Sequence, residues 1–326
     1  MRYYEIVISP SQKTSNFTPI TFSSLYNGQD NYAALQITLD IFQAPFHSPA
    51  GNAVVEIFGI DYNVLKRNLT FANTSIKVGM TKGLPLIKQN TTQIISGTIL
   101  ENFGNWQGTH VSLFLVISPQ IFDPLATQNI TFSWQKGKTL TDAVTSTLIN
   151  SYKVSVTGGY SPNLVFPETL NLQFTNLISF GTQINVLSKA IITDPNYIGA
   201  TIIPSPSGFI LNDGTLPQTQ SIVHTDIRYE DIIGNVTWLN YSTLQMKIVM
   251  RGDINIGDYV NIPKGVPILN TVSSYAQVRN NMSFTGNFYV SQVRHVGNFR
   301  QADANSWVTV IDMVAPYQLS NGIQPA

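Results

Sequence analysis

A regular alternation of apolar and polar residues recurs along this chain and constrains its fold more than any other feature of the sequence. The clearest examples are residues 35–41 and 244–250, and a final pair of apolar-rich segments follows at 286–297 and 307–314. A period of two directs successive side chains to opposite faces of a strand, one buried and one wetter. Val, Ile and aromatic residues dominate the final pair, which predicts a long hairpin around a polar turn at 298–306.

Other apolar segments predict further strands, separated by Gly, Pro and Asn clusters at intervals of about ten residues. We expect these strands at 1–8, 53–61, 75–80, 93–101, 111–118, 131–134 and 259–262. Residues 63–71 are compatible with a short helix or with irregular structure. The strand at 111–118 is apolar at odd and at even positions, so it needs cover on both faces. This spacing is typical of a β-barrel or a β-sandwich.

The middle of the chain predicts mixed α/β structure. Thr139 has the position of an N-cap, with Asp142 three residues later as in a capping box, and this indicates a helix over 139–152. The apolar stripe of that helix consists of Leu140, Ala143, Val144, Leu148 and Tyr152. A shorter helix is expected at 182–191, and a short hairpin at 202–214.

Charged residues are scarce: they form 11% of the 326 residues, whereas roughly 25% is usual in a soluble domain. Few charges weaken the usual defence of a β-rich surface against association, so we infer that partners cover much of the surface. A neutral, hydrated surface of an extracellular or viral protein is the alternative. The formal net charge of zero argues against a dedicated nucleic-acid binder, which normally carries a basic patch.

Cysteine is absent, which excludes disulfides, thiolate nucleophiles and cysteine-based metal sites. No segment approaches the roughly 18 apolar residues that a membrane-spanning helix needs. The N-terminus lacks the apolar run and small-residue cleavage site of a signal peptide, so we expect the mature chain to start at or near Met1.

Residues 136–139, with the sequence Lys-Gly-Lys-Thr, follow a predicted strand and precede a predicted helix, which is the context of a phosphate-binding P-loop. That motif needs a glycine five residues before Gly137, so that the backbone can surround the phosphates. Phe132 stands there instead. We therefore interpret the segment as a turn followed by a helix cap.

Four histidines and one group of carboxylates are the remaining candidates for chemistry. The histidines are His47, His110, His224 and His295. None is paired at helical spacing with another ligand type, and His224 with Asp226 lacks the third ligand that zinc usually needs. The carboxylates are Asp226, Glu230 and Asp231, with Arg228 between them.

A glycosidase requires two carboxyl groups that face one cleft, whereas neighbours on a strand point to opposite faces. Arg228 is expected to form an ion pair with one of these carboxylates. No nucleophile elbow and no dinucleotide-binding loop is present. We therefore predict no catalytic residue, no cofactor-binding residue, no metal site and no enzyme activity.

Arg294, His295 and Arg300 lie beside the turn of the closing hairpin. One interpretation is a solvated strand end. The other is a contact with a neighbouring subunit, for which the planar guanidinium is well suited. The sequence leaves both open.

Three segments together resemble the baseplate hub proteins of contractile-tailed bacteriophages, the family of the Mu-like and P2-like tail hubs, which is related to secretion-spike hubs. They are ITFSWQKGKTLTDAVTSTL at 130–148, IIPSPSGFILNDG at 202–214, and the closing hairpin at 286–314 with its VRHVGNFR and ANSWVTVI stretches. Their order and spacing match that family over most of the chain. The N-terminal β region fits in type rather than in motif.

The resemblance implies a mainly β fold with two tube-type antiparallel β-barrels and a mixed α/β middle domain. The implied division is a first barrel at 1–124, the middle domain at 125–216, a second barrel at 217–316 and a C-terminal tail at 317–326. It also implies a homotrimer whose six barrels form a ring around the tail channel. Such a hub adapts the six-fold tail tube to the three-fold central spike and is not an enzyme.

The implied partners are a tail-tube or tube-initiator protein on one side and the spike protein on the other, with baseplate wedge proteins also possible. DNA would be only a cargo in the channel, and the location would be the virion tail baseplate, assembled in the host cytoplasm. One alternative is a tail-tube or secretion-spike hub component of a related contractile machine. Another is a β-rich carbohydrate-binding or glycosidase tail module, which would need a groove of exposed aromatic residues with carboxylates.

Overall fold

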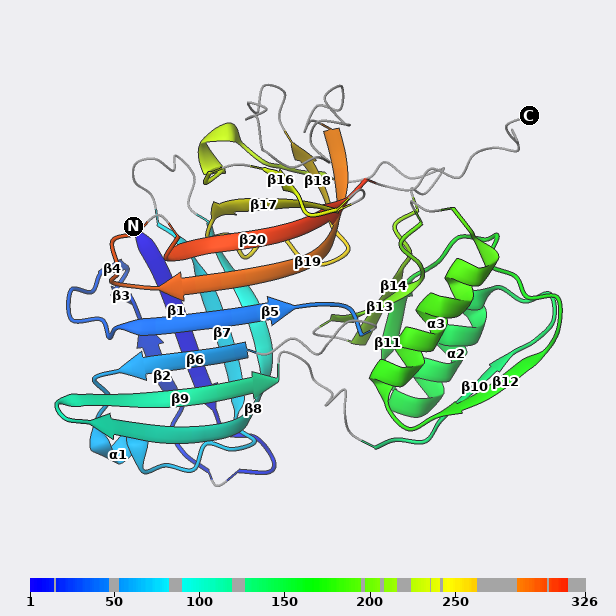
Figure 1. Ribbon diagram of the computed structural model, residues 1–326. Coiled ribbons are helices and arrows are strands. Elements are labelled where there is room, and N and C mark those ends of the chain that lie inside the picture. The colour runs from blue at the N-terminus through cyan, green and yellow to red at the C-terminus, as the bar shows by residue number, and fades with distance from the viewer. Residues whose placement is uncertain are drawn as a thin grey trace.

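A computed structural model of the chain shows two β-rich units and a smaller α/β unit (Figure 1). It describes residues 1–14, 16–46, 53–81, 90–118, 127–194, 197–205, 208–215, 224–234, 236–240, 243–262, 286–303 and 305–315. The predicted fold class, mainly β with a small α/β part, is confirmed. No helix within these residues is long and apolar enough to cross a membrane.

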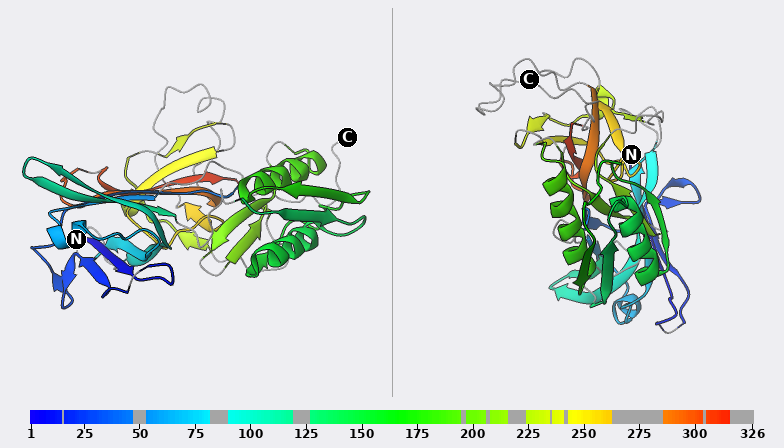
Figure 2. Two further views of the ribbon diagram at one scale, coloured as in Figure 1. Left: turned by 90° about the horizontal axis from the view of Figure 1, so that it is seen from below. Right: turned by 90° about the vertical axis from the view of Figure 1, so that its right-hand side faces the viewer.

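The N-terminal unit is built from two crossed layers of one sheet (Figures 1 and 2). Its elements are β1 (Arg2–Ser9), β2 (Ile20–Ser23), β3 (Leu25–Tyr26), β4 (Gln29–Asp30), β5 (Ile37–Gln43), β6 (Ala53–Phe58), α1 (Tyr62–Leu65), β7 (Asn73–Met80), β8 (Asn90–Gln107) and β9 (His110–Ser118). The order β5-β6-β9-β8 forms the front layer and β8-β7-β1-β2 the back layer. β8 belongs to both, because a bulge between Ile99 and Glu101 lets this long strand turn from β7 to β9.

Alternation explains the core of the N-terminal unit. Ile37, Leu39 and Ile41 on β5 point inward and meet Ile6 and Ile8 of β1, all of them buried. The strand at 110–118, apolar on both faces, buries Leu113, Leu115 and Ile117 in the same core. Its other face is half-buried, so the structure of the single chain covers that face only in part.

The C-terminal unit repeats this plan with fewer strands. Its elements are β15 (His224–Asp226), a 3₁₀ turn η1 (Tyr229–Asp231), β16 (Thr237–Trp238), β17 (Thr243–Val249), β18 (Tyr259–Ile262), β19 (Gly286–Asn298) and β20 (Trp307–Val314). β16-β17-β20-β19 form its front layer, while β18 pairs with the start of β19. Leu244, Met246 and Ile248 of β17 pack with Ile311 and Met313 of β20 in its core.

The expectation of two closed barrels is wrong for the described residues. The two units instead contribute to a single open sheet of 13 strands, whose path runs from β16 to β2. The reason is that the second half of β19 pairs with β5 of the other unit rather than returning to a strand of its own unit. The edge of β19 that could close a barrel within its own unit therefore joins the two units instead.

The middle unit has two small sheets between two helices (Figure 2). Its elements are β10 (Ile130–Trp134), α2 (Leu140–Tyr152), β11 (Ser155–Gly158), β12 (Leu170–Phe174), α3 (Leu177–Ile191), β13 (Thr201–Ser205) and β14 (Gly208–Asn212). The sheet orders are β10-β12 and β11-β14-β13. Its core includes Phe132, Trp134, Phe180 and Phe209, together with Phe46, which follows β5 of the N-terminal unit.

The first predicted helix has the expected start, whereas the second begins earlier than predicted. Thr139 caps α2, its hydroxyl accepting from the Asp142 backbone N at 3.2 Å as expected. The second helix begins at Leu177, not at 182, because Asn176 caps it by accepting from Ser179 N at 2.8 Å. The additional turn buries Leu177 and Phe180, which the shorter prediction omitted. Within 63–71, only the end of the one-turn α1 is helical.

Candidate functional site

Seven strands share one face that turns away from the hydrophobic cores, and we call it the open face. They are β17, β20, β19, β5, β6, β9 and the second half of β8, and Figure 1 looks onto this face. Alternate side chains in these strands are buried, and most of those between them are half-buried or exposed. The outward side chains include Gln245, Lys247, Val249, Val310, Asp312, Gln292, Arg294, Val296, Thr38, Asp40, Val54, Glu56, Val116, Phe114, Glu101 and Phe103.

The open face has no concentrated charge. Its carboxylates are Asp40, Glu56, Glu101 and Asp312, and its cations are Lys247 and Arg294. Four negative groups against two positive groups leave a small negative excess. Valine and phenylalanine occupy most of the remaining positions, so this is a largely apolar, weakly acidic surface rather than a site for an anionic ligand.

The open face is continuous because β5 and β19 pair with each other. Residues 293–298 of β19 form an antiparallel ladder with residues 38–43 of β5. On the open face, Arg294 Nε donates to Asp40 Oδ1 at 2.8 Å and Nη2 donates to Oδ2. Their side chains are 53% and 47% exposed, so solvent screens the pair, and it contributes at most about 1 kcal/mol. The ladder and the packing behind it, rather than this ion pair, hold the units together.

The polar turn of the closing hairpin binds the N-terminal unit through arginines. Arg2 of β1 donates from Nη1 to the backbone oxygens of Asn298 at 2.8 Å and Phe299 at 3.1 Å. In the opposite direction, the backbone N of Arg300 donates to Gln36 Oε1 at 2.9 Å. These bonds connect residues that are almost the whole chain apart, and they fix the angle between the two β units.

Aromatic side chains fill the space beneath that turn. Phe299 meets Tyr4 edge-to-face, with ring centroids 4.8 Å apart, and lies 6.0 Å from Trp307. The Trp307 indole N–H donates to the Gly79 backbone oxygen at 2.9 Å. Trp307 is buried and belongs to the core of the N-terminal unit although it begins β20. The two units therefore share core residues as well as a sheet.

His295 lies fully inside the junction. Its Nδ1 is 3.0 Å from Thr309 Oγ1, which also donates to the Arg251 backbone oxygen at 3.0 Å. A hydrogen bond therefore joins the two side chains. Burial lowers the pKa of His295 to about 4, and the nearby Asp253 carboxylate opposes the shift. His295 is therefore neutral at physiological pH.

Of the two interpretations of Arg294, His295 and Arg300, the solvated strand end describes the two arginines, whose side chains are exposed, and a contact with a neighbouring subunit stays a prediction. Arg294 and Arg300 contact the N-terminal unit of the same chain, and His295 is buried between β5 and β20. The segment is a joint within the chain.

Asp231, one of the carboxylates expected to pair with Arg228, forms its ion pair with Arg251 instead. Arg251 Nη1 lies 3.4 Å from Asp231, and its Nη2 lies 2.7 Å from Asp253. Burial raises the pKa of Asp231, and the charges of Arg251 and Arg228 oppose this rise. Burial alone would raise the pKa of Asp253, but the hydrogen bonds and charge of Arg251 lower it below its ordinary value.

The remaining sequence candidates do not converge on one place. His110 is exposed at the turn of the β8–β9 hairpin, and His224 pairs with Tyr259 through its backbone. His47 and the side chain of His224 lie outside the described residues. Among the residues that are described, no three His, Asp or Glu side chains are grouped closely enough to hold a metal ion.

The segment 136–139 is a turn and a helix cap. Gly137 has a φ of +75°, and the Lys138 backbone N donates to Gln135 O at 3.1 Å. The Lys138 oxygen in turn accepts from the Trp134 indole N–H at 2.8 Å. The backbone groups of this segment therefore bond to the Trp134 side chain or to other groups of the turn.

The sequence signal missed at this site was the N-terminal half of the joint. Segments with strand-like patterns contain Arg2, Gln36 and Asp40, and nothing in the sequence identified these residues as contacts of residues 294–300. From the sequence, Arg294 and Arg300 beside the turn were candidates for such contacts, but their partners could not be identified.

The fold is also found in solved structures of other proteins. The 43 kDa tail protein of prophage MuSo2 from Shewanella oneidensis matches with a TM-score of 0.54 and 8% identity, over 96% of this chain and 97% of its own. The E. coli c3393 protein, a type VI secretion system component described as similar to T4 tail proteins gp27 and gp5, matches with 0.51 and 10% identity, over 91% and 78%. The tail protein from Neisseria meningitidis MC58 matches with 0.50 and 10% identity, over 96% of both chains.

No protein-family model and no curated protein matches the sequence. At such low identity the structural matches establish the fold, and they do so over nearly the full length of the chain. The chain has the fold of phage tail proteins and of a type VI secretion system component, as the resemblance in its sequence indicated.

Proposed function

We propose that this protein is the trimeric hub of a phage tail baseplate, which adapts the six-fold tail tube to the three-fold central spike and surrounds the tail channel. The observation that carries the proposal is the ladder between residues 293–298 and 38–43. It places two β units side by side in one sheet of a single chain. Three copies of such a chain present six β units, which is the number needed to meet a six-fold ring.

The open face supports the position of the channel. It is broad, continuous across both β units, and free of a concentrated positive patch. A surface with Asp40, Glu56, Glu101 and Asp312 against Lys247 and Arg294 attracts the DNA backbone weakly or repels it. This is the property expected of a wall past which DNA moves as cargo. In our proposal the open faces of three copies line the channel.

The middle unit has the character of a separate attachment module. Its core, from Ile130 to Leu211 with Phe46, is distinct from the two β cores. We propose the division 1–124, 125–216, 217–316 and a tail at 317–326, with the tube or its initiator on one side of the ring and the spike on the other. Wedge proteins are further possible partners. The protein would reside in the virion tail baseplate after assembly in the host cytoplasm.

A structural role without catalysis accords with the placement of the candidate residues. Asp231 and Asp253 bind Arg251, and His295 is buried in the joint. Within the described residues, the contacts of these groups stabilise the fold, and the groups do not face a common cleft. The phage tail structures that share the fold agree with a structural role.

The experiment is a mass measurement of the purified chain by multi-angle light scattering across a wide range of concentration. The chain mass is 36.0 kDa, so the proposal expects a species of three times that mass. A hexamer or an open-ended stack would instead favour a tail-tube or secretion-spike component, because contacts that do not close produce filaments. A strict monomer that binds glycans on an array would favour the carbohydrate-binding tail module.

A further inference from the structure

The long strands β8 and β19 have the same place in their units. Each starts in the back layer against a shorter strand, β7 or β18, and each then passes a bulge. Each ends in the front layer as one arm of a hairpin, with β9 or β20 as the other arm. The two β units are thus structural repeats, although no sequence motif marks them as such.

The two strands differ at one edge only. The edge of β19 opposite β20 is filled by β5, the first front-layer strand of the other unit. The corresponding edge of β8 is covered up to Asn102, where the side-chain amide bonds the backbone of Arg67 and Leu69. From residue 103 to 107, no strand in the described part of the chain pairs with that edge.

The backbone of this edge is ready to accept a strand. The β8–β9 hairpin closes with Gln107 opposite His110 across a two-residue turn, so these two residues form a hydrogen-bonded pair. Alternation then directs the backbone N–H and C=O groups of Trp106 and Gly104 away from β9 and toward the free edge. An unpaired edge of this kind is a template for a strand of another chain.

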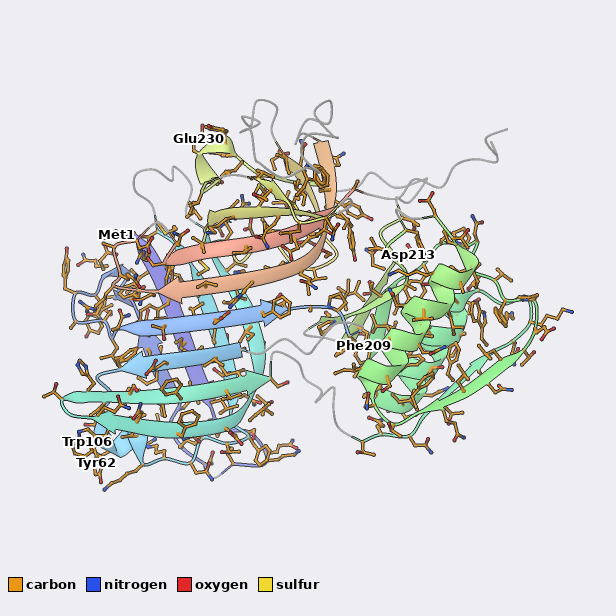
Figure 3. The ribbon with its side chains drawn as sticks, in the orientation of Figure 1. Met1, Tyr62, Trp106, Phe209, Asp213 and Glu230 are labelled. Carbon is orange, nitrogen blue, oxygen red and sulfur yellow. The ribbon has the colours of Figure 1, made fainter. Side chains whose placement is uncertain are left out.

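The side chains at the edge are unusually apolar for an exposed position. Trp106 is 66% exposed and packs on Tyr62 of α1, with ring centroids 6.3 Å apart. Phe103 is 49% exposed and stacks on Phe114 of β9, with centroids 5.0 Å apart. Figure 3 shows Trp106 and Tyr62 together at the end of the front layer, away from the middle unit.

The opposite end of the front layer provides a matching surface. β17 has the place in its unit that β5 has in the other, but its outer edge is already paired within the described part of the chain: β16 pairs with Leu244 and Gln245, and Ile232 forms a bridge to Ile248. Leu239, which follows β16, is 50% exposed. Tyr229, in the turn beside this end, is 53% exposed. Large apolar side chains are therefore exposed at both ends of the row of strands.

We infer that the free edge of β8, residues 103–107, binds the β16–β17 end of a second copy of this chain. The contact adds the β8 edge to the outer side of that end, as β19 adds to β5 within the chain, because β17 itself is already paired with β16 and Ile232. It is head-to-tail, so a ring results when the rotation between copies closes. This inference rests on the proposed hub function and assigns the residues of its subunit interface.

Cysteine cross-linking tests the pairing directly, because the chain has no cysteine of its own. The variants are Asn105→Cys at the β8 edge and Leu239→Cys at the other end, and the probe is a short bis-maleimide. The double variant should cross-link up to the trimer, a mixture of the two single variants should give dimers, and neither single variant should cross-link alone. Dimers of Asn105→Cys alone would mean a symmetric contact and would overturn the inference.

A matched pair of charge variants tests the need for the edge. Trp106→Glu places a carboxylate at the proposed contact, and Val186→Glu places one on α3 at a similarly exposed apolar position, 54% exposed. We expect Trp106→Glu to shift the assembly at least tenfold toward monomer at equal concentration, with circular dichroism unchanged, and Val186→Glu to assemble like the wild type. A trimer that survives Trp106→Glu and gives no cross-links would refute this interface but leave the hub proposal standing. A wild-type chain that is monomeric throughout would refute both.

Discussion

Acidification should weaken this protein through His295 more than through any other single group we can identify. The imidazole is fully buried in the joint between the β units, where burial lowers its pKa from an ordinary 6.5 to about 4. In the unfolded chain the same side chain is exposed to water and has its ordinary pKa. Between these two values the unfolded chain holds a proton on His295 that the folded chain does not.

The magnitude follows from this difference in proton affinity. At 1.36 kcal/mol for each pKa unit, the folded chain loses about 3 kcal/mol of stability through His295 as the pH falls from about 7 to about 4. The loss begins near pH 6.5 and levels off below pH 4, where both states carry the proton. About 3 kcal/mol is a large fraction of the stability of a typical domain.

The assay is urea unfolding at closely spaced pH values for the wild type and His295→Gln. Glutamine is neutral throughout and can still donate a hydrogen bond to Thr309. Asp231, Asp258 and Asp312, whose pKa values burial raises, vary with pH in the opposite direction. They are common to both proteins, so the difference between the two curves isolates His295.

We expect the stability difference between the two proteins to change by about 3 kcal/mol in favour of the variant as the pH falls from 7.5 to 4, because only the wild type loses this contribution. Parallel curves for the two proteins would show that His295 is solvated or protonated in the fold, and that our description of the joint is wrong.

Three further predictions concern single side chains. Trp307→Phe replaces the buried indole with a smaller phenyl ring and leaves the Gly79 oxygen without its donor, so it should cost at least about 1–2 kcal/mol in urea unfolding, and a cost near zero would contradict the bond. Thr139→Ala removes the cap of α2 and should cost about 1 kcal/mol, whereas Thr139→Ser should recover most of it. Arg294→Met should cost less than about 1 kcal/mol, and the cost should shrink in high salt; a larger, salt-independent loss would show that the exposed pair with Asp40 is stronger than its exposure allows.

Local patterns were sufficient to predict most individual elements. Alternation at 35–41 and 244–250, and the Val- and Ile-rich composition of 307–314, located three strands of the front layer, because both signals depend only on neighbouring residues. The cap at Thr139 gave the start of α2 for the same reason.

The arrangement of the strands could not be read in this way. β5 and β19 pair across some 250 residues, and any strand with one apolar face would satisfy the same alternation. The family resemblance predicted two β-barrels, whereas in the structure the second half of β19 pairs with β5 of the other unit. The second half of β8 was missed because Asn102, Gly104 and Asn105 interrupt its apolar pattern, although the hairpin with β9 holds them extended.

The measurement that most directly tests our account is electron microscopy of the purified assembly in negative stain. The account predicts a ring with a central hole, three-fold symmetry and six lobes of similar size, with the three α/β units attached at three-fold-related positions. A compact particle without a hole, or a ring in which the two β units of each chain do not alternate, would contradict the claim that one chain supplies two neighbouring segments of the channel wall.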